Sequence, residues 1–291
     1  MKIAYDVLAF YGLLLVWAAL LAVGLRRRRF APFLGFGVAL LVALNLRYFV
    51  AGPPAAIAFF IGIYDTFDNI GLGRTEGAPA LATCIDNACT VWGERYVNHP
   101  SWGVAFHERF LDGPQLRTNL LYGHILFNSI AFVLLHYQLY RPGLGPRPDR
   151  HRRLGRVAFA SLTLGTICAV WMASEHGSVD EYGAMAAELG FYSMSAIVYA
   201  TAVAGVVAAR RGDHGSHRTW MIRHLGSMWG SFWLFRVLLV FTGPLLRSYE
   251  TASVLISIWL SAPLGVLIAE YVRTRSLTAG ARVETPAPEL V

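Results

Sequence analysis

Long apolar runs separated by short polar segments dominate this sequence. The runs occupy residues 5–25, 30–50, 118–140, 157–174, 186–209, 225–246 and 251–272. A helix of about twenty apolar residues is long enough to cross the hydrocarbon core of a bilayer. The pattern therefore predicts an all-α fold, a polytopic transmembrane helix bundle of about seven spans.

Two stretches depart from this pattern. Gly52-Pro53-Pro54 breaks the second run, and residues 55–64 are too short to span, which indicates an interfacial or re-entrant helix or an extension of the second span. Residues 65–117 are polar and mildly acidic, and a loop of that length is expected to contain some helix. We therefore expect N-terminal helices in 1–64, an extracytoplasmic loop region in 65–117, a four-helix core in 118–246 and, in 247–291, a last helix whose tail beyond Arg273 is disordered.

The composition and the placement of charge support a membrane protein and predict its orientation. Only 15% of the residues are charged, against about a quarter in soluble domains. The arginine-rich segments 26–29, 141–156 and 210–211 fall on one side when the runs alternate, and the acidic segments fall on the other. By the positive-inside rule the N-terminus lies outside and the C-terminus inside the cell (inner) membrane. Loop retention then explains the net charge of +7, and we expect no nucleic-acid partner.

Two cysteines lie in the predicted extracytoplasmic loop. Cys84 and Cys89 would stand in an oxidising compartment, so we expect a local disulfide between them. A metal site with His99 or His107 is the alternative, although the spacing fits neither the CxxC redox motif nor the usual zinc spacing.

The third span carries polar residues on one face. His124 and Gln138 are fourteen residues apart, which at ~100° per residue places them about 40° apart, and Asn128 shares their face. His136 lies about 120° away from His124. A stack of two haems along this helix is therefore not expected. A single b-type haem would pair His124 with His176, or His136 with His224 or His217; the alternative is that these histidines make polar contacts inside the bundle.

Two histidine–arginine clusters lie at the predicted cytoplasmic surface. They could converge on a lipid phosphate, a haem propionate or a quinone-like ligand, or simply mark topology; their members are His151, Arg152, Arg156, His217, Arg218 and Arg223. Arg236 lies near the middle of the sixth span, where it needs a partner or a cavity. His124, Asn128 or the region of Glu175 could supply that partner.

The sixth span also carries aromatic and small residues. Trp229 and Trp233 are one helical turn apart, a spacing that favours packing over a cofactor site. Ser227, Gly230 and Ser231 on the same helix predict a close helix contact.

The order of these motifs resembles the DUF2306 family of uncharacterised bacterial membrane proteins. The resemblance covers about residues 120–245 and rests on H-x13-Q, HRxxGR, HRxWMIR and the later intramembrane arginine; the matching positions are His124, Gln138, His151, Arg152, Gly155, Arg156, His217, Arg218, Trp220, Met221, Arg223 and Arg236. It implies a four-helix core with two helices added before it and one after it. It implies no activity, and this chain departs from the family pattern at His224.

Three hypotheses of function are consistent with these residues. One is a redox-type membrane protein that binds haem b or a quinone through His124, Gln138, Arg236 and the two clusters. A second is a non-enzymatic transporter, or a protein that grips anionic lipids or a partner through the clusters; a third hypothesis is an assembly factor. The sequence contains no P-loop, nucleophile elbow or zinc-protease motif, which argues against ATP hydrolysis and acyl transfer.

Overall fold

A computed structural model of the chain describes residues 5–27, 29–69, 110, 113–139, 148–174, 184–245 and 250–281. All regular elements in these residues are helices. Seven segments among them are long and apolar enough to cross a membrane: Val7–Arg27, Ala31–Gly52, Gln115–Leu139, Asp149–Ala173, Met185–Arg210, His214–Gly243 and Ala252–Arg275. The predicted all-α bundle of seven spans is therefore confirmed.

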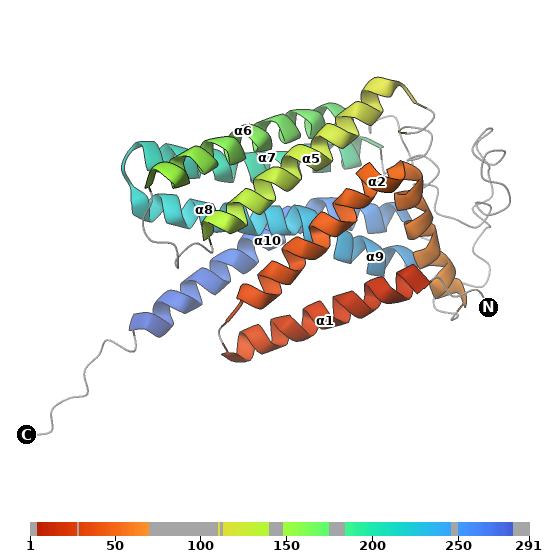
Figure 1. Cartoon of the computed structure of the whole chain (residues 1–291), viewed down its shortest axis with the longest axis horizontal. Coiled ribbons are helices and arrows are strands. Elements are labelled where there is room, and N and C mark those ends of the chain that lie inside the picture. Colours follow the sequence, from red (N-terminus) through yellow and green to blue (C-terminus); the bar gives the residue numbers. More distant parts are fainter. Residues whose placement is uncertain are drawn as a thin grey trace, which may run out of the picture.

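The helices lie side by side along the long axis of the molecule (Figure 1). They are α1 (Tyr5–Arg27), α2 (Ala31–Asn69), α5 (Gln115–Leu139), α6 (Pro148–Ala173), α7 (Ala184–Arg210), α8 (His214–Trp229), the π-helical turn η5 (Gly230–Leu234), α9 (Phe235–Leu245) and α10 (Glu250–Ala281). Neighbours in sequence pack as the pairs α1–α2, α5–α6 and α7–α8, while α10 packs against α7, α8, η5 and α9. Helix α2 joins the first pair to the bundle through α5 and α9.

One end of the bundle collects most of the arginines. Helices α1, α5, α7 and α10 finish there and α2, α6 and α8 begin there, at the left of Figure 1. The arginines of the described residues near this end are Arg26, Arg27, Arg29, Arg150, Arg152, Arg153, Arg156, Arg210, Arg211, Arg218, Arg273 and Arg275. We call it the basic end; by the positive-inside rule it is the end expected in the cytoplasm.

Several helix limits differ from those expected. The α6 helix begins at Pro148 and α8 at His214, so both histidine–arginine clusters lie within helices rather than in loops before them. Proline favours the first helical position, and the Asp213 carboxylate caps α8 by accepting the Ser216 N–H at 2.9 Å. Long arginine side chains can reach the interface from the first turns, so charge does not end the helix.

The predicted break after the second run is present, because α2 is kinked at Gly52, whose φ is 75°. Helical structure then continues to Asn69, further than the expected 55–64 segment. At the other end of the chain α10 continues to Ala281. Helix α10 therefore includes residues 274–281 of the tail beyond Arg273 for which disorder was expected.

Small residues allow α8 and the following turn η5 to approach α10 closely. A Cβ atom at Gly230 would lie 2.2 Å from the carbonyl oxygen of Ser261, and one at Gly265 would lie 2.1 Å from that of Gly226. Such distances are far below van der Waals contact, so neither position tolerates a side chain without separation of the helices. The close contact predicted from Gly230 thus has α10 as its partner.

An aromatic cluster attaches the first two helices to the sixth span. Trp17 stacks on Phe33 with ring centroids 5.0 Å apart and lies 4.4 Å from Trp233. The Trp233 indole donates to the carbonyl oxygen of Gly37 at 3.1 Å, and the ring of Trp229 lies against the same glycine. Trp229 and Trp233 therefore serve packing, as their spacing predicted.

Candidate functional site: an intramembrane pocket

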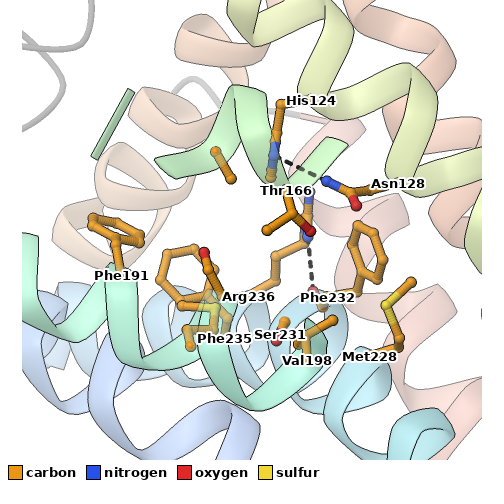
Figure 2. Close-up of a pocket in the computed structure, with 13 residues that line it drawn as sticks. His124, Asn128, Thr166, Phe191, Val198, Met228, Ser231, Phe232, Phe235 and Arg236 are labelled. Carbon is orange, nitrogen blue, oxygen red and sulfur yellow. Dashed lines mark hydrogen bonds between the residues drawn. The ribbon is translucent and has the colours of Figure 1, made fainter. Parts of the chain in front are cut away.

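A cavity of about 180 Å³ lies between α5, α6, α7 and the α8–η5–α9 helix, shown in Figure 2. Aromatic and aliphatic side chains form most of its wall, together with a small number of polar ones; its lining residues are His124, Asn128, Thr166, Ala169, Phe191, Met194, Ser195, Val198, Met228, Ser231, Phe232, Phe235 and Arg236. No acidic residue is among them. The pocket lies towards the end of the bundle opposite the basic end, because α5 begins and α6 finishes near it.

His124 and Asn128 form a hydrogen-bonded pair on one wall. The Asn128 side-chain nitrogen lies 3.0 Å from Nδ1 of His124 (Figure 2), and the Gly165 carbonyl oxygen lies 3.3 Å from the same atom. Because an amide NH2 can only donate, the shorter contact makes Nδ1 the acceptor and places the ring proton on Nε2. That N–H has no hydrogen bond within the described residues.

Gly165 on α6 leaves the space that the Asn128 side chain of this pair fills. A Cβ atom at this position would lie 2.6 Å from the side-chain amide of Asn128. The helix α6 backbone therefore passes directly against the amide, and only glycine permits this arrangement.

Arg236 extends across the pocket towards the His124–Asn128 pair (Figure 2). Its guanidinium donates to the Phe232 carbonyl oxygen at 2.8 Å and to Oδ1 of Asn45 at 3.4 Å. Asn45 is in turn held by Ser129, whose hydroxyl accepts from the Asn45 amide at 2.8 Å. No carboxylate within the described residues pairs with this arginine, so its charge is solvated only by neutral groups.

The predicted partners of Arg236 need a correction. His124 and Asn128 share its pocket, but the side chain that it bonds is Asn45 on α2, and Glu175 lies outside the described residues. Asn45 is 4% exposed. A buried amide at the level of a buried arginine provides the neutral solvation that the charge requires.

A π-helical turn shapes the wall that carries Arg236. Residues 230–234 form η5, and the N–H of Phe235 donates to the carbonyl oxygen of Gly230. A π-turn adds one residue to the helix and rotates the residues after it, and such turns are frequent at functional sites. Ser231, Phe232, Phe235 and Arg236, which lie in this turn and directly after it, all line the cavity.

Two hydroxyl groups complete the polar lining. Thr166 on α6 and Ser195 on α7 face the cavity and make no hydrogen bond within the described part of the chain. Among the described residues, the pocket therefore offers N–H and O–H donors on several sides, a positive charge and no carboxylate. Such a lining suits a ligand rich in acceptor oxygens.

His136 is committed to packing rather than to this pocket. The indole of Trp229 donates to its Nε2 at 2.7 Å, and its Nδ1 lies 2.7 Å from the Phe132 carbonyl oxygen. Because an indole can only donate, the imidazole is neutral and both of its nitrogens are engaged. His224 likewise places Nδ1 3.1 Å from the Val198 carbonyl oxygen. These contacts match the alternative to haem ligation, in which the histidines hold the bundle together.

The HRxWMIR motif fastens the α7–α8 hairpin. His217 donates through Nδ1 to the Gly205 carbonyl oxygen at 2.8 Å, and Met221 packs on the bare face of the same glycine. Arg223 donates to Glu270 on α10 at 3.2 Å and lies 4.7 Å above the Trp220 ring. These motif positions thus have structural roles.

The predicted site residues separate into two places. His124 and Arg236 belong to the pocket, whereas Gln138 lies beside Gly155 near the basic end. The remaining predicted residues gather at the basic end, with the His151 and His217 rings 6.1 Å apart; they are His151, Arg152, Arg156, His217, Arg218 and Arg223. Fourteen residues of helix separate His124 from Gln138, about 21 Å, so one ring or one head group cannot contact both groups of residues.

Other predictions fall on residues that the structure does not describe. The His124–His176 metal pair and the Cys84–Cys89 disulfide stay predictions, because His176, Cys84 and Cys89 lie outside the described residues. Sequence reasoning missed Asn45, Thr166, Ser195 and Glu270. Asn45 and Glu270 carried a signal, since both are polar residues inside apolar runs.

The comparisons with known proteins identify the family. The family model described as "Predicted membrane protein (DUF2306)" matches residues 121–273, more than half of the chain. The chain is thus a polytopic membrane protein and belongs to the DUF2306 family, as the motifs indicated. The matched range includes most of α10, beyond residue 245 where the resemblance of the motifs ended. No curated protein and no solved structure was found to match.

Proposed function

We propose that this protein binds the head group of a lipid-soluble quinone in the intramembrane pocket. One observation carries the proposal. The guanidinium of Arg236 lies in the same cavity of about 180 Å³ as His124, and no carboxylate among the described residues neutralises it. Arginine inside a bilayer marks a functional site by default. A quinone ring carries two carbonyl oxygens, and both can accept from the donors that line this cavity.

The volume favours a single ring over a porphyrin. A cavity of about 150 Å³ in another protein holds benzene, so 180 Å³ suits one six-membered ring. A porphyrin links four pyrrole rings and needs several times the space of one ring. Haem b is therefore not the ligand that this pocket supports best.

The distribution of the polar groups over four helices supports the proposal. His124 and Arg236 come from α5 and α9, whereas Thr166 and Ser195 come from α6 and α7. Donors on different helices can serve carbonyls on opposite sides of one ring. Phe191, Phe232 and Phe235 supply apolar aromatic walls for its faces.

The test is direct binding of a short-chain benzoquinone to the full chain in lipid nanodiscs. Equilibrium binding of radiolabelled decyl-benzoquinone is compared among the wild type, Arg236→Gln and Thr166→Val. The Thr166 hydroxyl has no partner within the described residues, so its removal leaves the fold intact. Loss of one neutral hydrogen bond weakens binding roughly three- to tenfold, and loss of the charge weakens it more. Arg27→Gln, at the basic end, is the matched arginine control and should bind as the wild type does.

Two results would contradict the proposal. If decanoate binds and the benzoquinone does not, the Arg236 charge serves a lipid carboxylate instead. The second result is a stoichiometric b-type haem signal in the reduced-minus-oxidised absorption spectrum that is lost in His124→Ala. It would show that the pocket binds haem.

A further inference from the structure

The basic end carries more positive charge than its acidic residues balance. Segments 148–156 and 210–218 together contain seven arginines and two aspartates. Asp149 lies 3.9 Å from Arg152, with the two side chains 82% and 70% exposed. Such an exposed pair contributes little.

The second aspartate, Asp213, caps the amino-terminal end of α8. Asp213 accepts the Ser216 N–H at the start of α8, and hydrogen bonds from the Ser216 side chain and backbone lower the pKa of Asp213. Its carboxylate therefore acts as the helix cap. Arg156 and Arg218 have no acidic partner within the described residues.

Glu270 neutralises Arg223, which therefore does not belong to the uncompensated charge. It pairs with Arg223 at 3.2 Å and also with Arg273. The charge of Arg223 is thereby matched inside the α8–α10 contact. Uncompensated charge remains on the segments that hold Arg152, Arg156 and Arg218.

Two histidines bring those segments together. The rings of His151 on α6 and His217 on α8 lie 6.1 Å apart, edge to face. The bond from Nδ1 of His217 to the Gly205 carbonyl oxygen fixes the orientation of this ring. Its Nε2 makes no hydrogen bond within the part of the chain that the structure describes.

We propose that this cluster binds a phosphate group, carried by the head group of an anionic phospholipid. Guanidinium groups bind phosphate through paired N–H donors. The imidazolium form of His217 adds a donor at Nε2, because its Nδ1 proton is held by the Gly205 carbonyl oxygen. The non-bridging oxygens of a phosphate can accept from donors on both helices at once. The amino-terminal ends of α6 and α8 both lie here and add partial positive charge. Both helices begin at the end of the spans, at the depth of head groups.

The test compares lipid binding by the detergent-purified full chain in native mass spectrometry. Phosphatidylglycerol is titrated against phosphatidylcholine, whose phosphate is accompanied by a cation. We expect phosphatidylglycerol to bind in preference. The double variant Arg156→Gln with Arg218→Gln should weaken that binding at least about tenfold, because each charge-assisted bond contributes about that factor.

Matched variants distinguish binding at this cluster from a general effect of positive charge. Arg26→Gln with Arg27→Gln removes the same charge at the same end and should leave binding unchanged; equal loss in both doubles would overturn the proposal. His217→Asn keeps a donor for the Gly205 carbonyl but lacks Nε2, so it should keep the fold and still weaken binding. Retention of full binding by the Arg156/Arg218 double variant would also overturn it.

Competition with inorganic phosphate tests whether the bound phosphate group belongs to a phospholipid. Failure of millimolar inorganic phosphate to displace the lipid supports a phospholipid site. Tight binding of inorganic phosphate with no lipid preference would keep the phosphate chemistry and overturn the phospholipid as its carrier.

Discussion

Single hydrogen bonds join different helices of this bundle, and the bond from Trp229 on α8 to His136 on α5 is the clearest case. The two atoms are 2.7 Å apart, and His136 is 4% exposed. We predict a coupling energy of about 1–3 kcal/mol in a double-mutant cycle with Trp229→Phe and His136→Leu. The measurement is the free energy of unfolding in detergent for the wild type, both single variants and the double variant.

A control cycle addresses the loss of aromatic packing. Trp171 is 52% exposed, so Trp171→Phe combined with His136→Leu should be additive. A coupling near zero for Trp229 and His136 would show that packing alone explains their contact.

At the same scale, the sequence predicted which residues matter better than what they touch. Hydropathy was sufficient to predict that Arg236 stands inside the membrane. Its partner Asn45 lies on α2, 191 positions earlier in the chain. Which faces two helices present to each other depends on packing over their whole length, and one sequence contains no direct record of it.

Among the helices, the contact of α8 and η5 with α10 depends most on the absence of side chains. A Cβ at Gly230 would lie 2.2 Å from the Ser261 carbonyl oxygen. We predict that Gly230→Ala lowers the free energy of unfolding by about 1–3 kcal/mol, because the backbone atoms must separate. Thermal or denaturant unfolding in detergent would measure this change.

The matched control is Gly35→Ala on α2. A Cβ there would meet nothing within 4 Å, so the higher helix propensity of alanine should raise stability by up to about 1 kcal/mol. Stabilisation by both substitutions would contradict the close approach of α8 and α10.

Helix existence could be predicted from the sequence, whereas helix ends could not. The apolar runs predicted all seven spans, but α6 and α8 begin nine and eleven residues before the runs at 157 and 225. Charged residues end a run of hydropathy without ending a helix, since arginine side chains reach the interface. The π-helical turn at Gly230–Leu234 had no sequence signal, because its residues also suit an α-helix.

For the whole molecule, the fold divides the predicted polar residues between two depths. One apolar-walled pocket holds Arg236 within the spans, and one cluster holds His151 and His217 at the basic end. The family motifs thus describe two separate features rather than one active site. Sequence order placed the motifs correctly in the chain, but their separation of about 21 Å depends on the helices on which they lie.

The orientation of the molecule in the membrane is the last prediction. Because the described arginines gather at the basic end, the positive-inside rule predicts that this end faces the cytoplasm. In a chain with its three cysteines replaced by serine, we introduce Gln115→Cys at the opposite end or Arg211→Cys at the basic end. A membrane-impermeant maleimide applied to intact spheroplasts should label the first variant and reach the second only after permeabilisation. Both side chains are exposed, so accessibility within the fold is matched. The reverse pattern would place both the basic end and its proposed phosphate site on the outer surface, where the anionic inner leaflet could not supply the lipid.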